Sequence, residues 1–272
     1  MHIVENKGAR IPALGLGTMR LKDETCVRIV SSALQQGYRH IDTAQMYGNE
    51  REVGEGLKAS KIPREQIFVT TKVWWDKFAP GDLENSVEES LAKLDLPFVD
   101  LLLLHWPNPK IPYVDTLNSL AKVKRAGLSK HVGVANNTVA LLAEAVKLSP
   151  EPLVNNQIEV HPLLDQKKIL AACAQHGVSV TAYCPIGRGK IDNAVLDRIG
   201  AQHGKSGAQV SLRWLVQQGM IVIPGTSKEE RLKENAAIFD FTLSDAEMAE
   251  IGTLAQPDGR IVSPPFAPKW DV

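Results

Sequence analysis

The sequence has few cysteines, no long apolar run and no net charge, and each absence argues against a class of protein. The three cysteines, Cys26, Cys173 and Cys184, are an odd number without a C-x-x-C pair, which disfavours a disulfide framework or a cysteine zinc site. No stretch approaches the ~18 consecutive apolar residues of a membrane-spanning helix. The 31 Lys and Arg residues balance the 31 Asp and Glu residues, so no bulk basic field favours nucleic acid or anionic lipid.

The remaining composition is typical of a globular protein. Hydrophobic residues make up 44% and charged residues 23% of the 272 positions. The N-terminal residues lack the apolar stretch of a signal peptide, so together with the few cysteines they predict a cytoplasmic protein. This length fits two ordinary domains or one large α/β unit, and we expect a single domain over residues 1–272. The balanced charge and the lack of an obvious apolar seam favour a monomer.

Glycines punctuate a repeating pattern of helical and extended segments. Four of them end a segment of helical period and stand directly before an apolar run: Gly37, Gly127, Gly177 and Gly219. Glycine is favoured just beyond a helix, where the backbone turns left-handed. The helical segments carry apolar side chains every three or four positions, as between residues 83 and 94. The apolar runs are short and mostly continuous, as in parallel strands covered on both faces.

Candidate strands lie near residues 38, 67, 99, 131, 154, 178, 220 and 238. Eight alternating units in ~250 residues predict an α/β fold of the (β/α)₈ barrel type rather than an open doubly wound sheet. Residues 3–11 predict a β-hairpin that turns at residues 6–8, and we expect it to plug the barrel from beneath. Residues 185–205 are a candidate lid. A capping-box signal at residues 244–247 predicts a short C-terminal helix, and a proline-rich tail follows it.

Polar side chains follow several of the predicted strands, at the rim where a barrel gathers its functional groups. They are Asp42, Lys72, His105, Asn136, Gln157 and Tyr183, with Tyr47 in the first loop. Each one alone is more often a surface or hydrogen-bonded core residue. Their convergence on one rim is what indicates a site.

These residue types suit proton donation to a carbonyl group. A tyrosine can donate its proton to a carbonyl oxygen if its pKa is lowered toward neutrality, and a nearby ammonium favours that shift. A carboxylate such as Asp42 would hold the lysine in place, and a histidine beside the phenol can orient the carbonyl oxygen. The set lacks a good nucleophile, so covalent catalysis is less attractive.

Other chemistries find less support in the spacing of motifs. His40-Ile41-Asp42 is not the His-x-His expected of a barrel hydrolase, and no carboxylates cluster for a divalent ion. We therefore expect no metal site. The phosphate-binding motifs GxGxxG and GxxxxGK[ST] are absent. Nothing near Cys184 in the sequence argues for a lowered thiol pKa.

Five segments, in this order, resemble the aldo-keto reductase family. They are residues 15–19 (GLGTM), 38–50 (YRHIDTAQMYGNE), 71–74 (TKVW), 99–107 (VDLLLLHWP) and 155–159 (NNQIE). The resemblance runs from about residue 3 to about residue 255 and is nearest to the bacterial 2,5-diketo-D-gluconate reductase-like members. It implies a (β/α)₈ barrel that holds a nicotinamide cofactor extended across its rim, without a Rossmann fold.

The resemblance also implies a role for each residue at a matching position. Tyr47 would be the proton donor, which Lys72 and Asp42 tune, and His105 would orient the carbonyl group. The implied cofactor-binding residues are Gly17, Thr18, Asn136, Gln157, Tyr183, Thr226, Arg231 and Asn235. Among these, the two amides would hold the carboxamide and the tyrosine would stack on the nicotinamide ring. Met19, Trp74 and Trp106 would line the substrate pocket, which we expect the tail from residue 260 to 272 to close.

Three positions depart from the usual family pattern. Ala135 and Cys184 stand where serines are common, and Gly225 replaces a lysine normally near the cofactor 2′-phosphate. We expect NADPH as the cofactor, with NADH possible because of Gly225.

The sequence therefore predicts an NADPH-dependent carbonyl reductase that acts on small aldehydes, α-dicarbonyls or keto sugars. The alternative is a redox-sensing subunit that binds the cofactor but turns over negligibly, because one fold supports several functions. A metal-dependent barrel hydrolase is a third interpretation, which the spacing disfavours.

Overall fold

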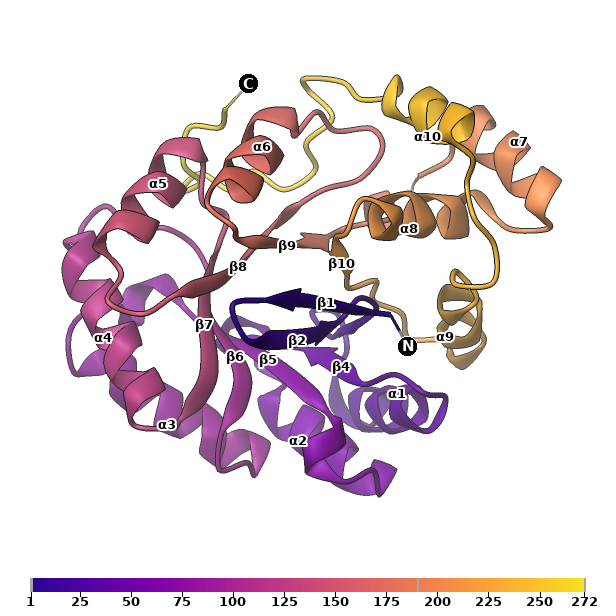
Figure 1. Cartoon of the computed structure of the whole chain (residues 1–272). Coiled ribbons are helices and arrows are strands. Elements are labelled where there is room, and N and C mark those ends of the chain that lie inside the picture. Colours follow the sequence, from indigo (N-terminus) through magenta and orange to yellow (C-terminus); the bar gives the residue numbers. More distant parts are fainter. Residues whose placement is uncertain (1, 190, 272) are drawn as a thin grey trace.

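The computed structural model describes residues 2–189 and 191–271, which form a parallel β-barrel surrounded by helices (Figure 1). Among these residues, eight strands pair in sequence order to form the barrel sheet. They are β3 (Leu16–Gly17), β4 (His40–Asp42), β5 (Phe68–Val73), β6 (Val99–Leu104), β7 (Ser129–Ala135), β8 (Leu153–Glu159), β9 (Ser179–Tyr183) and β10 (Ile221–Val222). All of these strand pairs are parallel, so the predicted (β/α)₈ barrel is confirmed.

The barrel closes where its first and last strands meet. Leu14 and Val222 form a parallel bridge. The amide of Gly15 donates to Val222 O at 2.9 Å, and the amide of Val222 donates to Ala13 O at 2.8 Å. These bonds leave neither edge of the sheet open.

Two glycines let the closing backbones approach each other at the rim. A Cβ atom on Gly17 would lie 2.6 Å from Ile223 O, and one on Gly225 would lie 2.8 Å from Gly17 O. Backbone oxygens cannot move aside as a flexible side chain can, so a side chain at either position would push the two segments apart.

A strand does lie near residue 38, as β4, but the predicted start and end of the barrel are wrong. The barrel begins with β3 at Leu16–Gly17, before the strand predicted near residue 38, and no strand lies near residue 238. Gly15 before β3 and Gly17 within it give this segment a low intrinsic strand propensity, and only its contacts with β4 and the closing segment make it extended. Ile238 lies in the turn after the helix Glu229–Ala236 and is apolar because it packs into the core. The seven strands predicted from near residue 38 to near residue 220 are confirmed.

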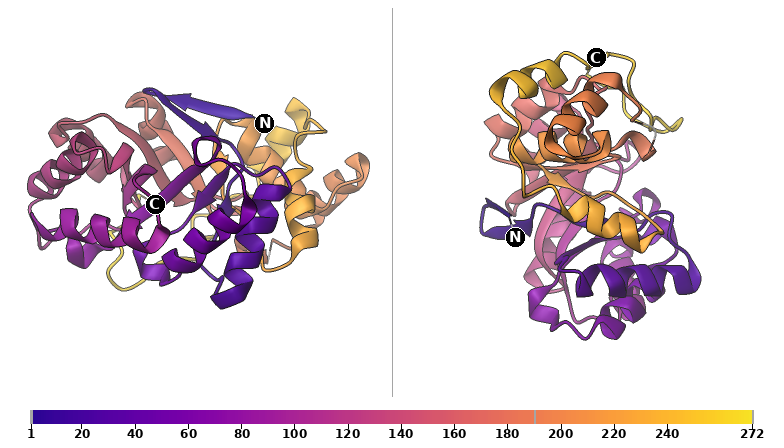
Figure 2. Two further views of the ribbon diagram at one scale, coloured as in Figure 1. Left: turned by 90° about the horizontal axis from the view of Figure 1, so that it is seen from below. Right: turned by 90° about the vertical axis from the view of Figure 1, so that its right-hand side faces the viewer.

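Helices cover the outside of the barrel (Figures 1 and 2). They are α1 (Asp23–Gln35), α2 (Glu50–Ser60), α3 (Asp82–Leu94), α4 (Tyr113–Arg125), α5 (Val139–Leu148), α6 (Lys167–Gln175), α7 (Ala194–His203), α8 (Gly207–Gln217), α9 (Glu229–Ala236) and α10 (Asp245–Gly252). Short 3₁₀ turns are η1 (Gln45–Tyr47), η2 (Arg64–Gln66), η3 (Trp75–Lys77) and η4 (Gly187–Gly189). None of the helices in the described ranges is long and apolar enough to cross a membrane.

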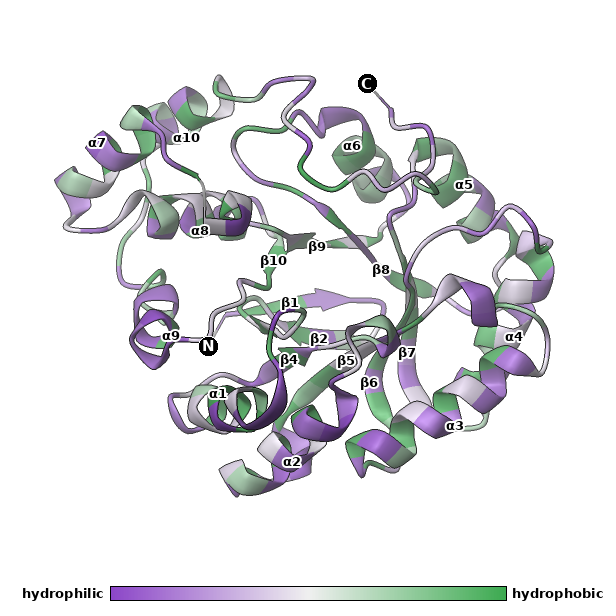
Figure 3. Ribbon diagram, turned by 180° about the vertical axis from the view of Figure 1, so that it is seen from behind, coloured by the Kyte–Doolittle hydropathy of each residue, from purple (hydrophilic) through white to green (hydrophobic). Residues whose placement is uncertain are grey.

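The helical periods read from the sequence are confirmed. Helix α3 buries Leu83, Val87, Leu91 and Leu94 against the barrel, and Figure 3 shows that the helices carry hydrophilic and hydrophobic residues together. The four glycines predicted to end helical segments all have positive φ. Ser244 caps α10, since its hydroxyl accepts from the amide of Glu247 at 3.3 Å.

The second half of the stretch predicted to be a lid is largely an α-helix. Within residues 185–205, α7 occupies Ala194–His203, and the side chain of Asn193 caps it by accepting from Val195 N at 2.9 Å. Its apolar residues are few, but Leu196 and Ile199 lie three positions apart and are fully buried in a small cluster. Lys190 in this stretch lies outside the described residues.

The predicted N-terminal hairpin is also confirmed. Strands β1 (Ile3–Asn6) and β2 (Ala9–Pro12) pair antiparallel, and Lys7 and Gly8 turn between them with φ of 46° and 86°. Ala9 and Ile11 join an apolar cluster with residues of β5, β6, β8 and β10. The hairpin therefore seals one end of the barrel, while the C-terminal segment lies at the opposite end (Figure 2).

This seal predicts a large loss of stability for Ile11→Ala. The side chain is fully buried, so removing it leaves a cavity and should lower the free energy of unfolding by about 2–4 kcal/mol. Urea denaturation checks this value. Arg10→Ala, on the same strand with a side chain 73% exposed, is the matched control and should change stability by less than ~0.5 kcal/mol. A change below ~1 kcal/mol for Ile11→Ala would show that the hairpin does not stabilise the barrel.

Candidate active site

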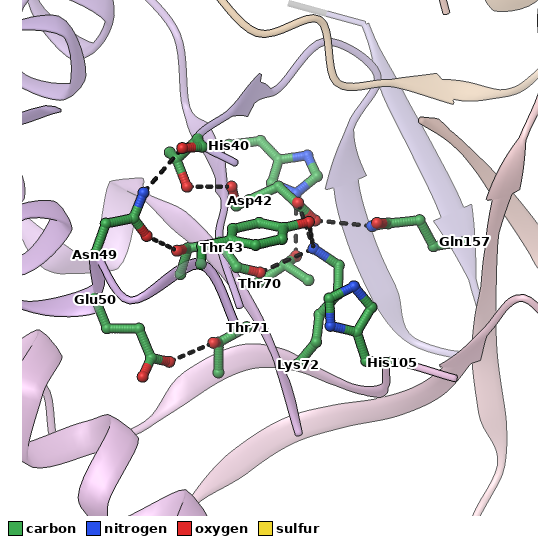
Figure 4. A network of polar contacts seen from close by, with 12 residues as sticks. His40, Asp42, Thr43, Asn49, Glu50, Thr70, Thr71, Lys72, His105 and Gln157 are labelled. Carbon is green, nitrogen blue, oxygen red and sulfur yellow. Dashed lines mark hydrogen bonds and ion pairs between the residues drawn. The ribbon is translucent and has the colours of Figure 1, made fainter. Parts of the chain in front are cut away.

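The barrel brings Asp42, Tyr47, Lys72 and His105 together at the carboxyl ends of its strands. Lys72 Nζ donates to Asp42 Oδ1 at 2.5 Å and to Tyr47 Oη at 3.3 Å, and Figure 4 shows His105 beside this group. The Lys72 side chain is 0% exposed and that of Asp42 is 1% exposed. A third bond, from Lys72 Nζ to Thr43 O at 2.8 Å, completes the environment of the buried ammonium.

Strand alternation explains why these side chains meet. Residues two apart point to the same side of a strand. His40 Nε2 therefore lies 3.1 Å from Thr70 Oγ1, and the next pair toward the rim is Asp42 with Lys72. Thr71 points the other way, where its hydroxyl donates to the buried Glu50 at 2.6 Å (Figure 4).

The phenol of Tyr47 keeps its proton more firmly than the sequence suggested. Burial raises the pKa of Tyr47 above its ordinary value, and the charge of Lys72 opposes this shift without reversing it. The expectation of a lowered pKa is therefore wrong for this state of the protein, because burial of the phenol outweighs the charge of Lys72, which the nearby Asp42 also offsets.

The pKa values of Lys72 and His105 shift in opposite directions. Burial alone would lower the pKa of Lys72, but attraction to Asp42 and to Tyr47 raises it above its usual range. Burial and the charge of Lys72 together hold the pKa of His105 well below its ordinary value. At neutral pH the site thus contains an ammonium and a neutral imidazole.

The imidazole lies between two aromatic rings. Its centroid is 5.7 Å from that of Tyr47 and 5.2 Å from that of Trp74, both in edge-on arrangements. Nδ1 of His105 is buried and has no hydrogen-bond partner among the described residues. A neutral imidazole offers one donor and one acceptor, so this ring retains unused hydrogen-bonding capacity beside the phenol.

Three residues predicted to hold the cofactor adjoin the same group. Tyr183 Oη donates to Asn136 Oδ1 at 2.7 Å, and Asn136 Nδ2 donates to His105 O at 2.9 Å. Gln157 Nε2 donates to the second carboxylate oxygen of Asp42 at 2.8 Å. Hydrogen bonds thus connect β4, β7, β8 and β9 across the rim.

The remaining cofactor residues fall into two groups. Gly17 and Thr18 lie at the end of β3, where the hydroxyl of Thr18 donates to Asp42 O at 3.0 Å. Thr226, Arg231 and Asn235 lie before and within α9.

Local contacts already engage two of the residues near α9. Thr226 Oγ1 accepts from the amide of Lys228 at 3.1 Å, and Arg231 Nη1 contacts Glu234 Oε2 at 2.8 Å. Arg231 is 54% exposed in its side chain, so this ion pair can open readily.

Most of these groups face one cavity of about 1020 Å³. Every residue predicted for the site lines it except Lys72, which lies beneath its floor. The predicted substrate residues Met19, Trp74 and Trp106 are among the lining. Within residues 2–189 and 191–271, no group of three or more His, Cys, Asp or Glu side chains could hold a metal ion.

The C-terminal segment supplies a part of the cavity wall that the sequence does not define. Ile261 and Phe266 line the cavity, and the Phe266 ring stacks on Trp75 with centroids 5.4 Å apart. Phe266 also meets Trp74 and Trp106 edge-on. The sequence predicts that this segment closes the pocket, but no sequence pattern identifies these partners, which lie more than 150 positions away. Val272 lies outside the described residues.

Comparison with known proteins agrees with this architecture. Residues 13–256 match the Aldo/keto reductase family. The methylglyoxal reductase DkgB of Escherichia coli O157:H7 is 39% identical over 266 residues, covering 96% of this chain and 99% of the relative. A 9,11-endoperoxide prostaglandin H2 reductase of Trypanosoma cruzi is also 39% identical, over 96% of this chain and 93% of the relative.

Solved structures are similar over the same extent. A putative 2,5-diketo-D-gluconic acid reductase B has a TM-score of 0.98 and 49% identity, covering 100% of this chain and 98% of its own. The Bombyx mori aldo-keto reductase in complex with NADP has a TM-score of 0.89 and 32% identity, covering 96% and 95%. The chain therefore belongs to the aldo/keto reductase family and is an NAD(P)H-dependent oxidoreductase.

Proposed function

We propose that this protein reduces small aldehydes, α-dicarbonyls or keto sugars with NADPH, and that Tyr47 donates the proton to the carbonyl oxygen. The observation that carries the proposal is the contact of Tyr47 Oη with the buried Lys72–Asp42 pair, 3.3 Å from the ammonium, at a cavity. Such a pair holds a positive charge at the point where a phenolate would form.

The chemistry of the cavity fits a nicotinamide coenzyme. Asn136 and Gln157 bring amide groups that can bind a carboxamide, and Tyr183 brings an aromatic face for a flat ring. Thr226 and Arg231 offer a hydroxyl and a guanidinium at the α9 end of the same cavity, which suits a phosphate. A coenzyme held this way would supply the hydride.

The protein's own residues would manage the proton. The raised pKa of Tyr47 keeps the phenol protonated at neutral pH, ready to donate to a carbonyl oxygen placed between its hydroxyl and His105. The neutral imidazole of His105 can donate to the same oxygen and so orient it.

Lys72 would stabilise the phenolate that forms when Tyr47 has donated its proton. Its ammonium stabilises the developing phenolate of Tyr47, and Asp42 keeps that ammonium charged and fixed. Gln157 and Thr43 O hold the two ends of this ion pair in turn. These groups are already in position, so little reorganisation is needed during the reaction.

The mouth of the cavity limits the substrate class. Met19, Met46, Ile261 and Phe266 line it with exposed fractions of 37–54%, and Trp74 and Trp106 form its inner wall. Apolar walls around a few convergent polar groups suit a small carbonyl compound. The names of the relatives, a methylglyoxal reductase and a 2,5-diketo-D-gluconic acid reductase, support α-dicarbonyls and keto sugars as substrates.

Turnover tests this function directly. NADPH consumption should be observed with methylglyoxal, a short aldehyde or a keto sugar, and Tyr47→Phe should lower kcat by about a hundredfold because the ring remains but the proton donor is lost. The coenzyme Kd should change little in this variant. Near-normal turnover by Tyr47→Phe would remove Tyr47 from the donor role. Coenzyme binding without turnover across the whole panel would favour a redox-sensing subunit instead.

The pKa shifts predict the pH profile of reduction. Donation requires protonated Tyr47, whose pKa lies above the ordinary value of ~10, so kcat/KM should stay flat from about pH 7 to about pH 9 and fall only at higher pH. The pKa of His105 is held well below ~6.5, so no inflection should occur near that pH. In Lys72→Met the phenol loses its cation, the rate should fall severely and the alkaline limb should move up. An inflection between about pH 6 and pH 8 in the unmodified protein would contradict these assignments.

Coenzyme preference tests the α9 end of the cavity. We expect NADPH to bind more tightly than NADH, and Arg231→Ala to raise the Kd of NADPH about tenfold without changing that of NADH, because the guanidinium would exchange Glu234 for the 2′-phosphate. Arg198→Ala is the matched control, since Arg198 is a half-exposed helix arginine paired with Glu250. Equal affinities for both coenzymes, or no loss in Arg231→Ala, would exclude the NADPH assignment.

A further inference from the structure

A buried acid of β8 holds the C-terminal segment at the cavity. Glu159 is fully buried at the end of the strand. Its Oε1 accepts from the amide of Ile261 at 2.6 Å and its Oε2 accepts from the amide of Val262 at 2.9 Å. One carboxyl group therefore holds two consecutive amides that are more than a hundred positions away in the sequence.

Two further groups surround the same carboxyl group. His161 Nε2 lies 3.1 Å from Oε1, and Arg260 Nη1 lies 3.9 Å from Oε2. The Arg260 guanidinium in turn lies 3.7 Å above the ring of Trp270. Buried polar groups that lose their partners are costly, so this arrangement favours one fixed position of the segment.

The place of Glu159 in the barrel links the segment to the proposed active site. Gln157 and Glu159 are two apart on β8 and share a side of the strand, and Glu159 is the register partner of Tyr183 on β9. Glu159 itself does not line the cavity among the described residues. Any effect it has on a substrate must pass through the residues that it holds.

We define the C-terminal strap as residues 260–271. It is anchored on both sides of Phe266. Immediately before the strap, Gly259 packs so closely against the backbone of Leu163 that a Cβ would lie 1.9 Å from Leu163 O. At its far end, Asp271 Oδ2 accepts from the amide of Val139 at 2.9 Å. Between these anchors, Ile261 and Phe266 form cavity wall.

We propose that Glu159 is a positioning residue that determines substrate specificity by fixing the C-terminal strap. Its carboxyl group sets the positions of Ile261 and Phe266, and these side chains set the shape of the apolar substrate end. The proposal rests on the proposed carbonyl reductase function. It assigns no contact between Glu159 and the reacting atoms.

The first test separates positioning from mere support of the fold. Glu159→Gln keeps the side-chain volume but turns an amide N–H₂ toward a backbone N–H, so one of the two bonds is lost. The KM for hexanal, which needs the apolar wall, should rise about tenfold, while kcat should stay within about twofold and the NADPH Kd should not change. The KM for methylglyoxal, which is smaller, should rise less. Loss of stability alone would not separate two substrates in this way.

A matched control variant and a conservative variant accompany this test. Glu151→Gln removes a carboxylate that pairs with Lys124 and Arg125 away from the cavity, and it should leave both KM values unchanged. Glu159→Asp keeps the carboxyl group on a side chain one methylene shorter, and it should give an intermediate KM for hexanal. Equal changes in KM for hexanal and methylglyoxal would overturn the specificity role.

A double-mutant cycle tests whether the effect passes through the strap. Phe266→Ala should raise the KM for hexanal, and adding Glu159→Gln should raise it little further, because both changes disrupt the same wall. Met19→Ala lies on a different segment of the mouth, so its effect should multiply with that of Glu159→Gln. Independent effects of Glu159→Gln and Phe266→Ala would overturn the proposed route.

Hydrogen exchange tests the anchoring without any turnover. In the unmodified protein the amides of Ile261 and Val262 should exchange about a hundredfold more slowly than that of Ser263, which has no acceptor among the described residues, and Glu159→Gln should remove much of this protection. Unprotected amides in the unmodified protein would overturn the proposal even if the variant failed to fold. Lost protection with unchanged KM would overturn the specificity role and leave the reductase function standing. Inactivity of the unmodified protein toward every carbonyl would overturn the proposed function, and the specificity role with it.

Discussion

The ion pair between Lys72 and Asp42 constrains the site around it. Removing an ammonium and a carboxylate from water carries a large penalty, which is offset only when the pair has good geometry and each remaining donor and acceptor finds a partner. Here Lys72 Nζ also donates to Thr43 O and Tyr47 Oη, and Gln157 occupies the second oxygen of Asp42. The phenol at the cavity floor is therefore one of the partners that the buried ammonium requires.

The hydrogen-bond partners of this buried ion pair come from distant parts of the barrel. Asp42 and Gln157 are 115 positions apart, yet their bond joins opposite halves of the sheet. Burial and the same positive charge together keep the pKa of His105 low, so the buried ammonium acts on both the phenol and the imidazole. The parallel barrel makes this possible because the carboxyl ends of all strands meet at one rim, where side chains from distant segments can share partners.

Much of this arrangement could be predicted from the sequence, and the exceptions have physical causes. Periodic apolar residues identified α3, and polar residues after apolar runs identified Asp42, Lys72 and His105, because these patterns reflect local geometry. The strand Leu16–Gly17 is formed by contacts with distant strands, so its own residues give no signal. The direction of the Tyr47 pKa depends on the balance between burial and charge, which spacing along the chain does not contain. The partners of Phe266 and Glu159 are equally non-local.

The close contact at the barrel seam bears on how coenzyme preference could be redesigned. The family commonly has a lysine where this chain has Gly225, and restoring that lysine is the direct way to add a positive charge for a phosphate. A Cβ at that position would meet the carbonyl oxygen of Gly17 at 2.8 Å, on the strand that completes the barrel. A lysine at this position would therefore push the backbones of the two closing segments apart. Gly225 thus lines the cavity and, because it has no side chain, also lets the two ends of the barrel sheet meet.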